Sequence, residues 1–400
     1  MTERTRVLVA GAGPVGAVIA YRLAEMGIDV VLVEPATHCA EDMRASTFHP
    51  PTLAMMEELG VLGELLADGL KAPVYQYRNR RSGNVISLDM ADIADMTPHP
   101  YRLQCEQYKL ARMLTGRLAN HPHGQVLFQH QLLSYAQDGD GVTVHVEGPL
   151  AIKTYRCDYL VGADGASSTV RKWMGVEFDG FTYPERFLTL STAYPVEQHY
   201  DNLANVSYMS DAAEWCVLLR VPTLWRVLVP SHEQESDAML LSDAKKSAVF
   251  AGLVPDGEAV QTYHRTLYRV HQRVARNFHQ GRVVLAGDAA HLNNPLGGFG
   301  MNSGIHDAWN LTDKLRDILL DGGQSDERLG LYDRQRRTIA SEFVQAQTIK
   351  NKKAMEASDT DGPSAQELYM EKLACDRELR REYMMNQAMI RSLEREQHIQ

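Results

Sequence analysis

Hydrophobic residues near the start of the chain follow a strand period, then a helix period, then a strand period again. Residues 6–10 form a short apolar run, which is typical of a buried parallel strand. From Val15 to Met26 the apolar residues recur at helical spacing, and Gly27 ends that pattern. Residues 28–33 form a second strand, rich in β-branched residues, that ends at Glu34. The order strand, helix, strand predicts a βαβ unit.

The middle of the chain alternates between strand and helix patterns, and the end is polar. The patterns predict short helices over 52–70, a helix over 106–119 and a helix over 304–320. They predict a hairpin over 74–88 with its turn at 80–83, and strands over 125–162 with a turn at 138–141. Further strands are predicted over 187–229, and a buried strand over 282–286. The Val-, Leu-, Tyr- and Trp-rich strands over 187–229 suit an antiparallel sheet that covers a pocket. Beyond residue 326 the chain is polar, Met-rich and helix-prone, with one predicted break at 359–363.

Composition narrows the class of protein. The chain has 400 residues, a net charge of −10 and a pI of about 5.8, which argues against binding to nucleic acid or to an anionic membrane. Its five cysteines form no CxxC pair and are odd in number, so neither disulfides nor a zinc site is indicated. No apolar segment suits a signal peptide or a membrane span. We therefore expect a cytoplasmic enzyme without a metal.

Three glycines after the first strand carry the first chemical signal. In the sequence Gly11-Ala-Gly13-Pro-Val-Gly16, the first glycine allows a tight turn, the second lets backbone approach a pyrophosphate, and the third lets helix pack on strand. Glu34 ends the second strand, where a carboxylate can accept hydrogen bonds from ribose hydroxyls. A glycine turn without a ligand is the alternative, but strand, motif, helix, strand and acid occur in the order that dinucleotide binding requires. This pattern does not separate NAD from FAD.

Two later motifs indicate FAD. They are Asp158-Tyr-Leu-Val-Gly-Ala-Asp164-Gly165-Ala-Ser-Ser168-Thr-Val-Arg171 and Gly281-Arg-Val-Val-Leu-Ala-Gly287-Asp288-Ala-Ala-His291, the second continuing into Pro295-Leu-Gly-Gly298-Phe-Gly300-Met301-Asn302. They resemble the DG and GD motifs of the class A flavoprotein aromatic hydroxylases, the family of p-hydroxybenzoate hydroxylase and phenol hydroxylase. The resemblance covers about residues 6–320.

The resemblance implies an α/β fold in which a Rossmann-like FAD-binding domain carries a mainly antiparallel β-sheet substrate domain and a helical C-terminal tail. Residues 1–73, 105–178 and 280–325 would form the FAD-binding domain, with the βαβ unit, the DG motif and the GD motif in turn. Residues 74–104 would add a hairpin, and 179–279 a sheet, to the substrate domain. The tail, 326–400, is expected to form a helical packing layer or a homodimer contact.

The resemblance also implies a set of FAD-binding residues. They are Gly11, Gly13, Gly16, Glu34, Arg44, Gln107, Asp164, Gly287, Asp288, Pro295, Gly298, Gly300, Met301 and Asn302. Asp288 can accept hydrogen bonds from the ribityl hydroxyls, although a helix N-cap is its simpler role. Asp164 and Arg171 would serve FAD and the pyridine nucleotide together, against the simpler readings of a strand-end carboxylate and a helix-surface arginine. Many relatives have glutamate where this chain has Ala111, which weakens the assignment of Gln107.

The implied reaction is monooxygenation of a small aromatic ring. NADH or NADPH would reduce FAD, O2 would add at flavin C4a, and the hydroperoxide would hydroxylate a phenol, a hydroxybenzoate-like compound or a hydroxypyridine. Tyr208 is the candidate for contact with a phenol, with a core or surface tyrosine as the alternative, and Pro295 should lie close to C4a. Arg220 could hold a substrate carboxylate, but an alignment with p-hydroxybenzoate hydroxylase puts Leu219 at its arginine. His291 is expected to be structural.

Three alternatives compete with this hypothesis. Flavin halogenases carry a WxWxIP segment, whereas this chain has Trp225-Arg-Val-Leu-Val-Pro230. A plain NAD-dependent dehydrogenase would leave the DG and GD motifs unexplained. A flavin-dependent oxidoreductase or flavin-binding protein without ring hydroxylation stays open, because cofactor motifs alone do not establish turnover.

Overall fold

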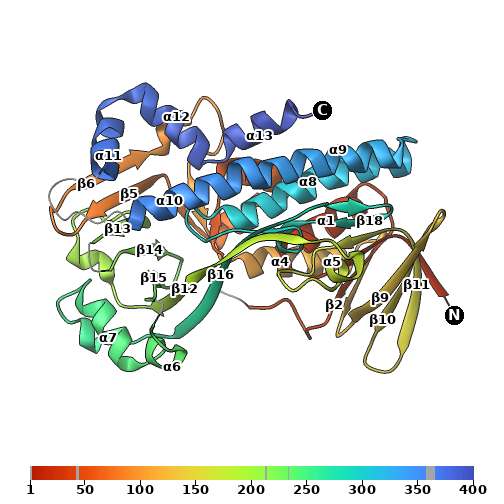
Figure 1. Cartoon of the computed structure of the whole chain (residues 1–400), viewed down its shortest axis with the longest axis horizontal. Helices are drawn as coiled ribbons and strands as arrows, with labels where there is room; N and C mark the ends of the chain where they lie inside the picture. Colours follow the sequence, from red (N-terminus) through yellow and green to blue (C-terminus); the bar gives the residue numbers. More distant parts are fainter. Residues whose placement is uncertain (1, 42–44, 212–213, 233, 357–364) are drawn as a thin grey trace.

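The structure is a computed structural model that describes residues 2–41, 45–211, 214–232, 234–356 and 365–400. The predicted FAD-binding residue Arg44 and the predicted break at 359–363 lie outside the described residues. Within them, the strands form two eight-stranded sheets and one three-stranded sheet, and Figure 1 shows the two large sheets next to each other.

The first sheet is built around a parallel centre in the order β17-β18-β11-β1-β2-β8. Its strands are β1 (Thr2–Ala10), β2 (Val30–Glu34), β8 (Gly124–Phe128), β9 (Gln131–Asp138), β10 (Gly141–Glu147), β11 (Ile152–Gly162), β17 (His279–Gln280) and β18 (Val283–Leu285). β9 and β10 join β11 as an antiparallel extension. Helix α1 (Pro14–Glu25) connects β1 to its parallel neighbour β2, so the predicted βαβ unit is confirmed.

Three parallel strands end at the same edge of this sheet. The register pairs Ala10 of β1 with Gly162 of β11, and Gly162 with Leu285 of β18. Gly11 of the glycine motif, Asp164 of the DG motif and Gly287 of the GD motif each lie within two residues after the end of one of these strands. The sheet therefore brings together loops that lie far apart in the sequence.

Helices pack against this sheet. They are α1, α4 (Gln107–Leu118), α5 (Thr169–Met174), α8 (Phe299–Leu320) and α9 (Ser325–Thr338), and the shorter helices α2 (Pro50–Glu58) and α3 (Leu62–Ala67) stand beside them. Residues 7–10 have at most 3% of their surface exposed, because a parallel strand covered on both faces must be apolar throughout. The predicted helices over 52–70 and 106–119 are confirmed.

The second sheet has the order β19-β16-β12-β15-β14-β13-β5-β6. Its strands are β5 (Val74–Asn79), β6 (Val85–Asp89), β12 (Phe178–Thr192), β13 (Val206–Ser210), β14 (Cys216–Arg220), β15 (Trp225–Pro230), β16 (His264–Ala275) and β19 (His291–Leu292). Every described pair is antiparallel except β13 with β5. The antiparallel sheet and the hairpin over 74–88 were predicted correctly.

Several elements beside this sheet were not predicted. Strand β16 alternates apolar residues with outward Arg269, His271 and Arg273, so its apolar content is low. Helices α6 (Asp237–Leu240) and α7 (Asp243–Ala251) cover the outer end of the sheet. The remaining short elements are β3 (Thr47–Phe48), β4 (Leu70–Ala72) and β7 (Arg102–Gln104), which form the third sheet, and the 3₁₀ turns η1 (Met90–Ile93), η2 (Val196–His199), η3 (Gly257–Ala259) and η4 (Gly287–Ala289).

Helix α8 begins at Phe299, so the predicted start at Gly304 was wrong by one and a half turns. Gly298 precedes it with φ 70°, a left-handed conformation that glycine adopts without steric cost. The glycine-rich sequence obscured this start, because Gly300 and Gly304 are poor helix formers in isolation. The GD segment therefore leads directly into the N-terminus of a long helix.

The tail is helical, as predicted, and packs on its own chain. After α9 come a π-helical segment η5 (Ile339–Gln345), α10 (Ala346–Glu356), α11 (Ala365–Cys375), α12 (Arg377–Gln387) and α13 (Ile390–Gln397). In Figure 1, α8 and α9 run side by side, and α11 and α12 lie against the edge of the second sheet near β6. The hydroxyl oxygens of Tyr77 and Tyr383 are 2.8 Å apart across that contact.

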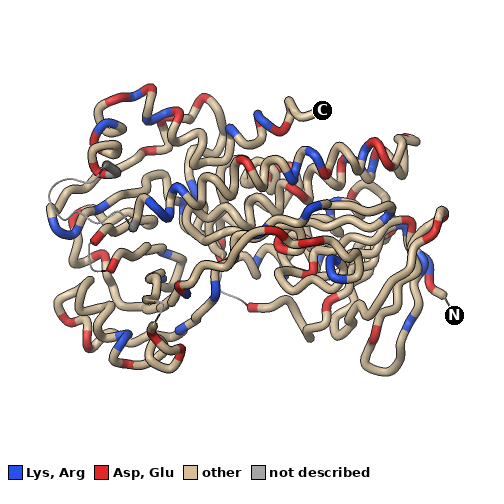
Figure 2. The backbone as a smooth tube through the Cα atoms, in the orientation of Figure 1, with Lys and Arg blue, Asp and Glu red and all other residues tan. Residues whose placement is uncertain are grey.

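The surface carries both signs of charge. Figure 2 shows lysine and arginine interspersed with aspartate and glutamate along the helices and strands in this view. Among the described residues, no helix is long and apolar enough to span a membrane.

Two glycines on helices provide a test of the packing in the βαβ unit. A Cβ at Gly16 would lie 1.9 Å from the carbonyl oxygen of Gly11, whereas a Cβ at Gly63 would have no atom within 4 Å. We expect Gly16→Ala to lower the free energy of unfolding by about 2 kcal/mol or more through overpacking. Gly63→Ala should be neutral or raise it by up to about 1 kcal/mol. Urea unfolding of both variants measures this, and equal effects would contradict the predicted contact.

Candidate active site

A cavity of about 330 Å³ lies between the edge of the first sheet where the three motifs meet and one face of the second sheet. The first sheet contributes Gly13, Ala163, Gly165 and Asp288 to its wall. The second sheet contributes Thr189, Leu219, Arg226, Leu228 and Tyr268. The segment from Leu292 to Met301 and residues 45–47 close the space between them.

The glycine motif has the geometry that its sequence predicts. Gly11 has φ 101°, and a Cβ there would lie 2.4 Å from the carbonyl oxygen of Ala163. Gly13 is the N-cap of α1 and lines the cavity, and a Cβ there would meet no protein atom within 4 Å. Open space directly before a helix N-terminus fits a pyrophosphate, because the helix dipole and the free N–H groups favour an anion there.

Glu34 lies at the end of β2, as expected. Its carboxylate accepts hydrogen bonds from the backbone N–H groups of Ala12, at 2.8 Å, and Ala36, at 3.1 Å. These bonds fix the side chain beside the glycine turn, and each carboxylate oxygen has a further lone pair. The ribose contact of Glu34 stays a prediction.

The GD loop presents one carboxylate to the cavity. Gly287 and Ala289 are buried, whereas Asp288 between them is exposed and lines the cavity. Gly298, Gly300 and Met301 at the N-terminus of α8 line it too, as does Pro295. The positive end of α8 is thus directed at the same space, which suits a group that becomes negatively charged on reduction.

Asn302 is completely buried and braces this loop. Its amide nitrogen donates to the carbonyl oxygens of Thr47, at 2.8 Å, and Gly298, at 2.7 Å, and its amide oxygen accepts from the N–H of His49 at 2.9 Å. Both amide hydrogens are used within the protein. Any effect of the Asn302 amide donors on FAD is therefore exerted through the loop.

The DG motif holds its own loop together. The Asp164 carboxylate accepts from the hydroxyl of Ser168, at 2.5 Å, and from the backbone N–H groups at the start of α5. Arg171 is buried, donates to the carbonyl oxygens of Ala166 and Ala289, and lies 3.8 Å above the ring of Phe178. Arg171 therefore fastens the DG loop to the GD loop, a role that the reading as a helix-surface arginine did not anticipate.

The two candidate catalytic residues lie in different places. Pro295 lines the cavity, and so does Gln107 at the start of α4. Tyr208 is 6% exposed and does not belong to the cavity wall; its ring stacks on Tyr77 with the ring centres 4.9 Å apart. Tyr208 lies near the buried guanidinium of Arg102. Tyr208 thus lies behind the wall, among other tyrosines.

Arg226 is the functional candidate that the sequence did not reveal. It is 4% exposed, lines the cavity from β15, and donates to the hydroxyl of Ser46 at 3.2 Å. Its cross-strand partner is Leu219, whereas the guanidinium of Arg220 lies above the ring of Trp225. Alternation along β15, which puts Arg226 and Leu228 on one face, could have indicated it.

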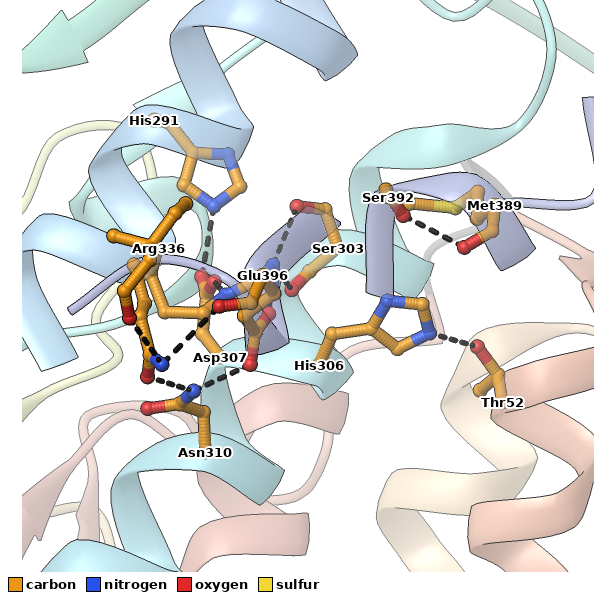
Figure 3. Close-up of polar contacts among 12 residues, drawn as sticks. Thr52, His291, Ser303, His306, Asp307, Asn310, Arg336, Met389, Ser392 and Glu396 are labelled. Carbon is orange, nitrogen blue, oxygen red and sulfur yellow. Dashed lines mark hydrogen bonds and ion pairs between the residues drawn. The ribbon is translucent and has the colours of Figure 1, made fainter. Parts of the chain in front are cut away.

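A buried polar network lies behind the GD loop (Figure 3). One carboxylate oxygen of Asp307 accepts from the N–H of Gly287 at 3.0 Å and from Nε2 of His291 at 2.7 Å, and the other accepts from Nε of Arg336 at 2.6 Å. Although burial raises the pKa of Asp307, its contacts with His291 and Arg336 outweigh that effect and lower the pKa to about 2. His291 is 3% exposed and has a structural partner.

Comparison with known proteins agrees with this geometry. Residues 4–347 match the family of FAD binding domains. Para-nitrophenol 4-monooxygenase of Pseudomonas sp. strain WBC-3 is 31% identical over 385 residues, which cover 95% of this chain and 94% of the relative. The chain belongs to the FAD-dependent aromatic hydroxylases. Its cofactor is FAD, and NAD(P)H is the electron donor typical of this family.

Two further comparisons support the assignment of this hydroxylase. The 6-hydroxy-3-succinoylpyridine 3-monooxygenase HspB of Pseudomonas putida strain DSM 28022 / S16 is 30% identical over 354 residues, covering 88% of this chain and 89% of the relative. The crystal structure of p-nitrophenol 4-monooxygenase PnpA from Pseudomonas putida DLL-E4 superimposes with a TM-score of 0.91 at 29% identity, covering 96% of this chain and 98% of the other. The predicted family, fold class, cofactor and aromatic monooxygenase activity are confirmed over the three alternatives.

The buried His306 predicts how the stability of the hydroxylase depends on pH. Burial, and then the nearby Arg336, lower the pKa of His306 from 6.5 to about 3. Between those pH values the unfolded chain binds this proton and the folded chain does not, so stability falls as the pH falls from 6.5 towards 3. The slope is about 1.4 kcal/mol per pH unit for one proton.

We expect His306→Gln, which can keep a hydrogen bond to Thr52, to reduce that slope between pH 6.5 and 4.5 by about one proton. Urea unfolding at a series of pH values measures the slope for both proteins. Parallel slopes would show that His306 becomes charged in the folded chain.

Proposed function

We propose that the substrate is a small hydroxylated aromatic compound whose ionised oxygen or carboxylate faces Arg226. The position of Arg226 carries this proposal: it is a buried cation in a wall otherwise formed by Leu219, Leu228, Tyr268 and the hydroxyl of Thr189. Apolar side chains suit the faces of an aromatic ring, and a guanidinium with fixed donors suits an anionic substituent.

The names of the relatives agree with this class of substrate. One is named for a nitrophenol and the other for a hydroxypyridine that bears a succinoyl group. In both, an aromatic ring carries a hydroxyl group and a second polar substituent. We propose a phenol or hydroxypyridine of similar size for this chain.

We assign the chain's residues the following parts in the reaction. Bound FAD supplies the electrons taken from NAD(P)H and activates O2. Gly13 and the N-terminus of α1 hold the pyrophosphate, Asp288 accepts from the ribityl hydroxyls, and Pro295 contacts the flavin ring. Gln107, together with residues 45–47, forms a part of the cavity wall that contacts the cofactor. Arg226 favours the ionised ring oxygen, which enriches the ring in electrons, and the leucines of the second sheet keep water away.

We propose that the segments divide their tasks as the motifs indicate. Residues 1–73, 105–178 and 280–325 would bind FAD, and 74–104 and 179–279 would bind the aromatic ring. The five cysteines are free thiols, four of them buried, which supports a location in the reducing cytoplasm. A homodimer through the tail is part of the same proposal.

The activity is tested on the purified protein by absorbance spectroscopy and anaerobic mixing with NADH or NADPH. We expect flavin bands that bleach faster when the correct phenol or hydroxypyridine is present, and hydroxylated product when O2 is admitted. A protein that takes up no FAD, or that bleaches equally with every ring compound and forms no product, would contradict the proposal.

Asp288 provides a test of the cofactor assignment. Asp288→Asn removes the carboxylate that faces the cavity, and we expect the dissociation constant of FAD to rise about tenfold, because charge-assisted hydrogen bonds contribute roughly 1.5–3 kcal/mol. Asp140→Asn, in the exposed turn between β9 and β10, is the matched control and should leave it unchanged. Quenching of flavin fluorescence measures both. Equal affinities in the two variants would remove Asp288 from the FAD site.

Arg226 provides a test of the substrate assignment. We expect Arg226→Gln to raise KM for an ionised phenol by about 10- to 100-fold and Arg226→Lys to raise it less, because the lysine keeps a charge. Arg220→Gln is the control on the neighbouring strand and should change KM less than twofold. Steady-state kinetics at several pH values measure this. An Arg226→Gln enzyme that keeps the preference for the ionised phenol would contradict the role of Arg226.

A further inference from the structure

The end of the chain is fixed by three consecutive residues of α9. Nε of Arg334 donates to the carbonyl oxygen of Gln400 at 2.9 Å. The Gln335 amide donates to the carbonyl oxygens of Glu396, at 3.2 Å, and Ile399, at 3.1 Å. Arg336 donates through Nη1 to the carboxylate of Glu396. Helix α13 is thus docked on α9 through one buried ion pair as well as its backbone.

Arg336 connects helix α13 to the GD loop. Its side chain is completely buried, and its other donors reach Asp307, at 2.6 Å, and the carbonyl and hydroxyl oxygens of Ser303, at 3.1 and 3.2 Å. Asp307 in turn accepts from the N–H of Gly287, the residue before Asp288. Figure 3 shows the groups from Glu396 to Asp307 converging on the Arg336 guanidinium. Direct contacts therefore connect the last helix of the chain to the loop that faces the cavity.

The buried charge of Arg336 is compensated by the carboxylates of Asp307 and Glu396. Arg336 is surrounded by Asp307 and Glu396 and is 0% exposed, so loss of either carboxylate leaves part of its charge buried without compensation. Glu396 also accepts from the amide of Asn310 on α8. Removing Glu396 should therefore let Arg336 shift, and Asp307 shifts with it because they share a hydrogen bond.

We propose that Glu396 is a positioning residue for FAD, which acts through Arg336 and Asp307 on the GD loop. This inference rests on the placement of FAD at Asp288 in the proposed function. Coupling between two sites is reciprocal in free energy. If Glu396 strengthens FAD binding, then FAD must strengthen the docking of α13.

The first test compares two glutamates of the same helix. Glu396→Gln should raise the dissociation constant of FAD about tenfold, whereas Glu394→Gln, which loses only the partly exposed ion pair with Arg391, should change it less than twofold. Flavin fluorescence measures the affinity of each apoprotein, prepared by reversible removal of FAD. Far-UV circular dichroism shows whether each apoprotein is folded.

The second test uses the wild-type chain and does not depend on any variant. We expect added FAD to slow hydrogen–deuterium exchange of the backbone amides in residues 390–397, and to leave α7, which contributes nothing to the cavity wall, unchanged. Mass spectrometry of the peptides, with and without FAD, measures this. In Glu396→Gln the FAD-dependent protection of residues 390–397 should be lost.

The outcomes separate this inference from the proposed function. A wild-type chain that binds FAD, with equal affinity in Glu396→Gln or with no FAD-dependent protection of residues 390–397, overturns the inference alone. A lower unfolding temperature of Glu396→Gln with unchanged FAD affinity assigns Glu396 a purely structural role and also overturns it. A wild-type chain that takes up no FAD contradicts the proposed function itself.

Discussion

The parallel register of β1, β11 and β18 is the constraint on which the rest of the molecule depends. It places Ala10, Gly162 and Leu285 side by side, so three loops from distant parts of the sequence start at one edge of one sheet. Backbone hydrogen bonds continue past the strand ends: the N–H of Ala163 donates to Ala10 at 2.9 Å, and the N–H of Ala286 donates to Gly162 at 3.0 Å. These backbone hydrogen bonds therefore hold the three loops together at one edge of the sheet.

This register also explains where glycine is required. A side chain at Gly11 would collide with the backbone of Ala163 in the neighbouring loop, and one at Gly16 would collide with Gly11 itself. Gly13 is different, since nothing in the protein lies in front of it. Gly11 and Gly16 are needed for packing, and Gly13 leaves space for a ligand.

The loops use most of their polar groups on one another, so few remain for the cavity. Asp164, Arg171 and Asn302 are each bonded within the loops, although their sequence motifs alone suggested contacts with cofactor. Asp288 and Arg226 also have contacts within the protein and line the cavity from opposite sides. Asp288 places a negative charge on the wall beside the predicted FAD-binding motifs, and Arg226 places a positive charge on the opposite wall. The cavity is therefore electrostatically polar from one wall to the other. This polarity suits an anionic ring held against a flavin.

The sequence was sufficient for features that depend on neighbours in the chain. Strand and helix periods, the glycine turn and the two later motifs each occupy a short segment, and they led to the correct fold class, family and cofactor. The sequence was not sufficient for features that depend on a contact between segments far apart in the chain. Arg226 lies opposite Leu219 on the neighbouring strand β14, and both line the cavity, whereas Tyr208 lies outside the cavity wall and stacks on Tyr77 of strand β5. Alternation along β15 indicates that Arg226 and Leu228 share a face, but no local pattern identifies the partner residue in either contact.

The network at Asp307 shows most clearly why such contacts escape a reading of the sequence. Arg336 and Glu396 lie in a polar, helix-prone tail whose sequence predicts helical packing but not which charges it buries, and their side chains are 0% and 12% exposed. Burial raises the pKa of Asp307, but its partners hold the pKa at about 2, so the carboxylate keeps its charge throughout the neutral range. A charge that stays ionised in a dry interior needs partners on every side. Glu396 of the tail is the outermost residue of this network, and Asp307 is the innermost, which accepts a hydrogen bond from the GD loop.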